Sequence, residues 1–182
     1  MNCFYPKLKR SQLPTMTGIT LLGGLTGGIY GSLHDLLTYS ISSEYFTRMK
    51  FAQFEHVDPG LPPRLFAAQI GFIAVAAVGL AAGWFIARTV VPVWPARMAW
   101  RKALRAFLLM TLIAASAAAI GNLLGLKTDI GGMLWNDLGE SLGVADEPAF
   151  LRVALIHTAG YLGALAGLVV AILHLRRAKP HP

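Results

Sequence analysis

Four long apolar blocks constrain the fold of this chain more than any other feature. They cover about residues 15–36, 66–88, 104–125 and 150–174. A helix needs roughly 20 consecutive apolar residues to cross the hydrocarbon core of a bilayer, and each block reaches that length. The sequence therefore predicts an all-α integral membrane protein, with residues 1–182 forming a single transmembrane domain built as a four-helix bundle.

The overall composition agrees with this prediction. Only 14% of the 182 residues are charged and 55% are hydrophobic, whereas a soluble domain usually carries about 25% charged residues. The first block follows three basic residues, as a signal peptide would, but it is too long for one and no A-x-A cleavage site follows it. We therefore interpret it as an uncleaved first span. The single cysteine excludes a disulfide within the chain and a CxxC redox pair.

Most of the basic residues and all of the acidic residues behind the net charge of +7 lie on opposite sides of the four predicted spans. Eleven of the 16 lysines and arginines precede the first block, lie between the second and third, or follow the fourth. All nine acidic residues lie in the two loops at the other side, 37–65 and 126–149, or at the block ends next to them. The positive-inside rule then places both termini in the cytoplasm. The charge indicates attraction to anionic lipid rather than nucleic-acid binding.

Glycines recur every fourth residue in three of the blocks. The series are Gly23, Gly27 and Gly31; Gly71, Gly79 and Gly83, interrupted by Val75; and Gly163 and Gly167, followed by Ala171. This spacing lets two helix backbones approach closely in lipid. It predicts one tight bundle, and the alternative is that a glycine-rich face mediates self-association or docks on another membrane subunit.

The two loops that carry the acidic residues, 37–65 and 126–149, also contain helical patterns. Residues 42–56 predict a short amphipathic helix with a serine at its start and Glu44 in its first turn. Its aromatic face is expected to lie on the membrane or over the mouth of the bundle. A second short helix is predicted around Asp137, and Asp146 followed by Pro148 predicts the start of the fourth span.

All four blocks place their most polar residue in the same outer layer. His34 and Asp35 end the first block, and His157 lies roughly 10 Å inside the fourth. Gln69 and Asn122 occupy the same level in the second and third. Ionisable side chains cost about 2.5–3.5 kcal/mol each on membrane-insertion scales, which makes them functional candidates. The sequence predicts a cluster of imidazole, carboxylate and amide groups that opens to the outer side.

Each of these residues also has a purely structural explanation. His34 and Asp35 lie near a helix end, where a polar side chain reaches headgroups or water. Asn122 is of the type that joins helices by hydrogen bonding, and Glu44 suits the first turn of a helix without any other role. His157 lies deepest, and its position favours a functional or network role.

Two arginines begin spans, where the helix dipole disfavours a cation. They are Arg64 and Arg152. Lipid phosphate is the usual partner of such residues. Pairing with Asp35 or Glu44 is the alternative.

The segment after the first block carries a pattern of its own. It reads HDLLTY and then EYFTRMKFAQF, between His34 and Phe54. The pattern resembles that of an uncharacterised family of small bacterial four-span membrane proteins, over about residues 27–84. The resemblance implies a role for the outer segment beyond a tether. It implies no activity, cofactor or substrate. We predict separately that the chain lies in the bacterial inner (plasma) membrane.

A metal site is the leading functional hypothesis. Imidazole and carboxylate groups together suit iron, copper, zinc or manganese, and the predicted ligands are His34, Glu44 and His157. An open coordination position would support metal-assisted chemistry on a lipid or periplasmic substrate. A haem held between the two histidines is a special case. The additional ligands or network residues are Asp35, His56, Asn122, Asp137, Tyr161 and Arg64.

Two other function classes compete with the metal site. A small-solute or proton transporter would use the same cluster, but the sequence has no inverted repeat and no polar path to the cytoplasmic side. A structural or accessory subunit would bury its glycine faces against a larger membrane complex and would need no chemistry. The sequence assigns no enzyme class, because no P-loop, GxSxG, HExxH or GxGxxG motif is present.

Overall fold

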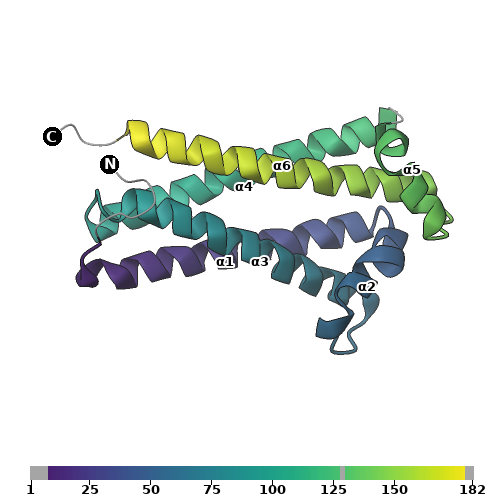
Figure 1. The fold of residues 1–182 in the computed structure, drawn as a ribbon, viewed down its shortest axis with the longest axis horizontal. Helices are drawn as coiled ribbons and strands as arrows, with labels where there is room; N and C mark the ends of the chain where they lie inside the picture. Colours follow the sequence, from purple (N-terminus) through teal and green to yellow (C-terminus); the bar gives the residue numbers. More distant parts are fainter. Residues whose placement is uncertain (1–7, 128–129, 179–182) are drawn as a thin grey trace.

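Four long helices run side by side in the computed structural model, which describes residues 8–127 and 130–178 (Figure 1). They are α1 (Leu13–Tyr39), α3 (Pro63–Val90), α4 (Ala96–Lys127) and α6 (Glu147–Arg177). Each predicted apolar block lies within one of them, and the described residues contain no strand. The prediction of an all-α chain is therefore confirmed.

The long helices differ in how apolar they are. Among the described residues, α3, α4 and α6 are long and apolar enough to cross a membrane. The first helix, α1, is not in this group, because glycines and threonines dilute its leucines. Its outward face is nevertheless apolar, with an exposed aliphatic side chain at every fourth position: Leu21, Leu25, Ile29, Leu33 and Leu37.

The long helices pack as two close pairs, α1 with α3 and α4 with α6. Where α1 crosses α3, a Cβ on Gly31 would overlap the carbonyl oxygen of Gly71, and a Cβ on Gly23 would overlap that of Gly79. A Cβ on Gly163 of α6 would overlap the methyl group of Ala117 in α4 and crowd the backbone beside it. The predicted glycine faces are therefore buried inside the chain, where they bring helix backbones into contact.

An apolar core fills each end of the bundle. At the end where α1 begins, Ile19, Ile86 and Val90 pack with Trp94 from the short turn between α3 and α4. This turn contains the two prolines of the predicted inner loop. At the other end, a second core surrounds Phe150 near the start of α6. The two cores leave the middle of the bundle to smaller side chains.

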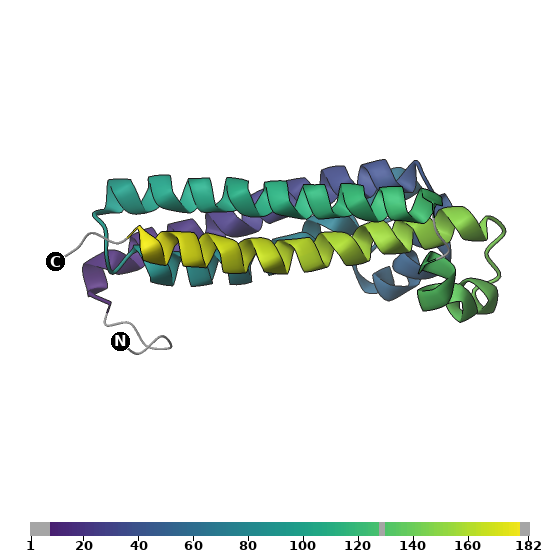
Figure 2. The ribbon, with the colours of Figure 1, turned by 90° about the horizontal axis from the view of Figure 1, so that it is seen from above.

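The segment after α1 folds over the second end of the bundle, beside α5 (Ile130–Ser141) (Figures 1 and 2). It comprises η2 (Tyr45–Lys50), which is π-helical, then α2 (Phe51–Gln53) and η3 (Glu55–Val57). Tyr45 and Phe46 are buried in the core around Phe150. The predicted loop helix is present, and its aromatic side chains lie over the mouth of the bundle.

The remaining short elements also match their sequence signals. The helix predicted around Asp137 is α5, and Asp146 caps α6 by accepting a hydrogen bond from the Ala149 backbone N–H at 3.2 Å. Pro148 stands in the first turn of α6, where its missing N–H costs nothing. At the opposite end of the molecule, η1 (Arg10–Gln12) precedes α1.

Candidate metal centre

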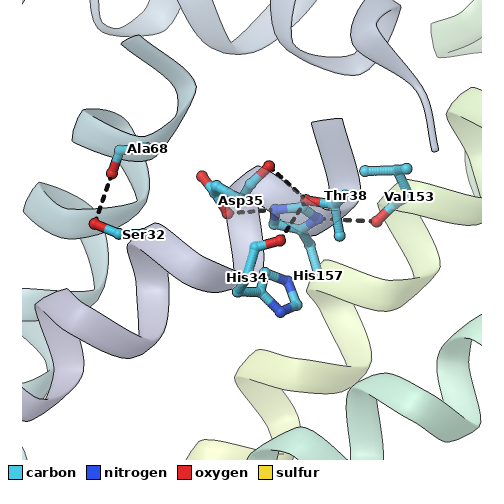
Figure 3. Close-up of polar contacts among 7 residues, drawn as sticks. All are labelled: Ser32, His34, Asp35, Thr38, Ala68, Val153 and His157. Atoms are coloured by element: carbon cyan, nitrogen blue, oxygen red, sulfur yellow. Dashed lines mark hydrogen bonds and ion pairs between the residues drawn. The ribbon is translucent and has the colours of Figure 1, made fainter. Parts of the chain in front are cut away.

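Two histidines and one aspartate form a buried cluster where α1 meets α6 (Figure 3). His34 and Asp35 lie just over one turn before the end of α1, and His157 lies in the first third of α6. One potential ligand atom from each residue lies within 4.8 Å of the other two. Asp35 is only 4% exposed and His157 only 3%. The structure therefore brings together, from distant parts of the chain, three of the candidate residues.

The close contact between α1 and α3 makes room for the aspartate. A Cβ on Gly71 would stand 2.8 Å from the Asp35 carboxyl carbon as well as overlapping the backbone of Gly31. Only a glycine at position 71 lets the carboxyl group lie this close to α3. One turn before Asp35, the Ser32 hydroxyl donates to the Ala68 carbonyl at 2.9 Å and joins the same two helices.

The hydrogen bonds of His157 define the state of its ring. Its Nδ1 lies 3.0 Å from the Val153 carbonyl oxygen, which can only accept, so Nδ1 carries a hydrogen. Its Nε2 lies 3.1 Å from Oδ1 of Asp35. A neutral ring protonated on Nδ1 and an ionised carboxylate would present only lone pairs to each other there. The contact therefore needs a proton or a metal cation between the two atoms.

Aromatic rings surround His157 and hold its plane. Tyr45 stacks on it with ring centroids 4.7 Å apart, and His34 meets it edge-on at 4.8 Å. Burial raises the pKa of the Tyr45 hydroxyl, which therefore stays neutral, and the Lys50 ammonium lies 5.9 Å from the Tyr45 ring centre. The segment that contains Tyr45 and Lys50, called the outer segment below, thus covers the cluster at the end of the bundle.

The spacing of the imidazoles does not fit a haem held between them. A haem iron with two axial histidines needs a porphyrin plane between the two rings. Here His34 and His157 are in edge-to-face contact, with an interplanar angle of 80°, and leave no room for that plane. A single ion bound at the edge of the rings is the arrangement that the cluster accommodates.

Glu44 does not join the cluster, which differs from the predicted ligand set. Its two carboxylate oxygens accept hydrogen bonds from the backbone N–H groups of Ala145 at 3.0 Å and Asp146 at 2.8 Å. These bonds lower the pKa of Glu44. The side chain therefore ties the outer segment to the turn before α6, and Asp35 supplies the carboxylate of the cluster instead.

Asn122 and Arg64, two residues of the predicted network, form hydrogen bonds outside the cluster. Arg152 donates from Nε to Oδ1 of Asn122 at 2.7 Å, and this bond joins α6 to α4. Arg64 donates to the Ser40 hydroxyl at 3.3 Å. Neither arginine is bonded to Asp35 or Glu44, so the predicted pairing with those carboxylates is not what the structure shows. Asn122 therefore joins two helices by a hydrogen bond, which is the structural role that the sequence offered for it.

The other predicted network residues lie around the cluster rather than in it. His56 is exposed and stacks on Phe54, with ring centroids 6.4 Å apart. Asp137 is exposed on α5. Tyr161 lies one helical turn from His157, with ring centroids 6.3 Å apart. Of these three residues, Tyr161 alone contacts the cluster.

Sequence reasoning missed the role of Tyr45. Tyr45 packs directly on the imidazole of His157, although the sequence does not single it out as a candidate. Its position immediately after Glu44 carries no periodic signal that distinguishes it from Phe46. The contact depends on how the outer segment folds back over α6, which local sequence does not specify.

Comparisons of the chain with known protein families, with curated proteins and with solved structures found no match. The resemblance of the segment from His34 to Phe54 to small bacterial membrane proteins therefore stays a prediction. The geometry of the cluster is the basis on which a function for this chain rests.

Proposed function

We propose that this chain is a four-span inner-membrane protein that binds one transition-metal ion through His34, Asp35 and His157. The observation that carries the proposal is the Nε2–Oδ1 contact of 3.1 Å, in which His157 donates its other ring N–H to a backbone carbonyl. Metal-binding imidazoles are held in this way, because the second hydrogen bond fixes the ring and its tautomer. Two imidazoles and one carboxylate suit zinc, iron, manganese or copper.

The distances support an ion with an open position. Ligand atoms about 2.0–2.1 Å from a tetrahedral zinc ion stand roughly 3.3 Å apart. The contact between Asp35 and His157 is close to this spacing, and the less buried His34 would turn toward the pair to complete the set. Three protein ligands leave the fourth position to water or a substrate, as in catalytic zinc sites.

The surface of the bundle supports the membrane location. Large aliphatic and aromatic side chains are exposed along all four long helices, including the leucine stripe of α1. Such a continuous apolar exterior is what a bilayer covers, and it is rare on a soluble monomer. Basic residues gather at the end where α1 begins and α6 ends, which the positive-inside rule places in the cytoplasm. The metal cluster then lies toward the periplasm.

Metal binding by the purified, detergent-solubilised protein tests the proposal. Wild-type protein titrated with zinc, iron, copper or manganese should hold one ion per chain after the free metal is removed. His157→Ala and Asp35→Asn should weaken binding by about 100-fold or more, since even supporting residues of metal sites contribute about 10–100-fold. His56→Ala is the matched control, because His56 is exposed and lies outside the cluster.

Two results would overturn the proposal. One is a folded wild-type protein that takes up none of the four metals. The other is a His157→Ala variant that keeps its helix content and binds metal as tightly as the His56→Ala control.

A further inference from the structure

A narrow cavity continues from the cluster into the middle of the bundle. All four long helices line it, and along α1 it extends from Asp35 to Gly23, about 18 Å at 1.5 Å per residue. Its volume is about 60 Å³, which is room for roughly five water-sized spheres at about 10–15 Å³ each. The cavity is therefore a small passage between the pair α1–α3 and the pair α4–α6.

The walls of this passage below the cluster are mainly apolar and small. They include Gly27, Val78, Ala82, Phe107 and Ala164. Apolar cavities stay dry, because a trapped water needs several polar partners. The passage is therefore suited to methylene groups and unsuited to a column of water or a hydrated ion.

A second hollow, of about 400 Å³, opens on the side of the molecule and reaches the cluster at His34. It lies mainly between α1 and α4, and its walls include the exposed side chains of Leu33, Leu37 and Ala119. Tyr30 and His34 line both this hollow and the inner passage. A molecule dissolved in the bilayer can thus reach the cluster sideways, without passing through water.

Tyr30 lines both hollows, and its hydroxyl group lies buried beside them. This hydroxyl has no hydrogen-bond partner among the residues that the structure describes. Native structures almost always pair a buried hydroxyl, so an orphaned one indicates a group that the protein itself does not supply. Tyr30 is one helical turn from His34, so a ligand oxygen bonded to it would lie beside the cluster.

From these features we infer that the site binds a membrane-dissolved amphiphile with one unbranched hydrocarbon chain and a small head that carries a hydroxyl or carboxyl oxygen. The chain lies in the passage, and the head oxygen accepts the Tyr30 hydrogen bond at the cluster. The inference rests on the proposed function, because it names the class of ligand that takes the open position of the metal. A two-chain phospholipid does not fit a passage of about 60 Å³.

Photochemical labelling in vesicles tests the inference on the full-length protein. The probe is a straight-chain primary alcohol with a diazirine near its tail. Illumination should label residues of the deep passage, such as Ala82 and Phe107, and an excess of the unlabelled alcohol should abolish that labelling. Labels on bilayer-facing residues such as Leu25 should not respond to the competitor, because they report probe in bulk lipid.

Two variants and one matched control make the test specific. Ala164→Phe fills the passage, and Ala119→Phe narrows the side hollow at an exposed position where folding is not at risk. Both should reduce the competed labelling to background. Ala166→Phe places the same ring on the exposed face of α6 and should label like the wild type.

Metal content measured on the same samples separates this inference from the proposed function. If wild-type protein binds metal but shows no competed labelling of the passage, the amphiphile site is refuted and the metal centre stands. Labelling of Ala119→Phe at the wild-type level would also refute it. Competed labelling in a protein that takes up no metal would support the amphiphile site and overturn the metal centre.

Discussion

Two acidic residues, Asp35 and Glu44, show how much depends on the direction of a side chain. They are nine positions apart and both were candidates for the same site. Asp35 lies on α1 beside the contact of Gly31 with Gly71, so its carboxyl group points into the bundle toward His157. Glu44 lies beyond the end of α1, and its carboxylate receives the backbone N–H groups of the turn before α6. Asp35 is part of the cluster, and Glu44 fixes the outer segment that packs over the cluster.

The variant Glu44→Gln is expected to loosen the outer segment. A glutamine accepts hydrogen bonds only through its single oxygen, and its NH₂ group would face a backbone N–H that it cannot satisfy. Limited proteolysis of the solubilised protein within residues 40–62 should be faster than in the wild type. Glu55→Gln removes an exposed acid from the same segment and should leave the rate unchanged.

The lowered pKa of Glu44 also predicts how the wild type responds to pH. Because the folded pKa lies below the ordinary value of 4.5, the contact stabilises the outer segment fully above about pH 4.5. That stabilisation is lost as the pH falls through the lower, folded value. Cleavage of the wild type by an acid protease should therefore approach that of Glu44→Gln in this range. A difference between the two that persists unchanged to the lowest pH would contradict this role.

At the scale of elements, glycine decides which helices touch. The backbones of α1 and α3 meet at Gly31 and Gly71, whereas α1 and α6 are separated at the cluster by side chains. Gly160 of α6 faces that wider space, with room for a Cβ in ordinary contact, 3.6 Å from Ala118 and 3.9 Å from His34. Tight pairing on one side and looser contact on the other leave the cavity between the two pairs.

Substitution of these two glycines should therefore have unequal effects. Gly31→Ala drives a methyl group into the backbone of α3 and should lower the free energy of unfolding by about 1–3 kcal/mol, as overpacking does. Gly160→Ala meets no clash and gains up to about 1 kcal/mol of helix propensity, so its stability should equal or exceed that of the wild type. Denaturant unfolding in mixed micelles, followed by circular dichroism, would measure both. Equal losses in the two variants would show that the described packing is incorrect.

For the molecule as a whole, the orientation in the membrane is the property with the most consequences. The cluster of His34, Asp35 and His157 lies toward the end of the bundle that carries α2 and α5, away from the turn between α3 and α4, which Arg88 and Arg97 flank (Figure 1). If that turn is cytoplasmic, an ion or a water-soluble metal chelator reaches the cluster from the periplasm. The lateral hollow between α1 and α4 instead opens on the side of the bundle, between the exposed apolar side chains of Leu33 and Leu37.

Cysteine accessibility in intact cells would establish this orientation. In a background with Cys3→Ser, the exposed positions of Asp58→Cys and Arg97→Cys lie in segments at opposite ends of the bundle. A membrane-impermeant thiol reagent applied from outside should label Asp58→Cys at once. Arg97→Cys should be labelled only after the inner membrane is permeabilised. The reverse pattern would place the cluster on the cytoplasmic side.

Much of the fold can be predicted from the sequence, because helix length and apolar periodicity are properties of contiguous residues. The four blocks each lie within one long helix, and the cap at Asp146 is where its signal predicts. The depth of His34 and His157 along their helices follows from counting residues at a fixed rise, which placed both in one layer. For the same reason the helix in the first outer loop was predictable.

The tertiary structure alone decided which side chains of that layer meet. Helical spacing gives the height of a residue but not the rotation of one helix against another, and that rotation depends on the backbone contact between Gly31 and Gly71. It turned Asp35 rather than Glu44 toward His157, placed Tyr45 over the ring, and left Tyr30 facing an apolar passage. Contacts between distant helices are set by packing, and no linear pattern in the chain specifies them.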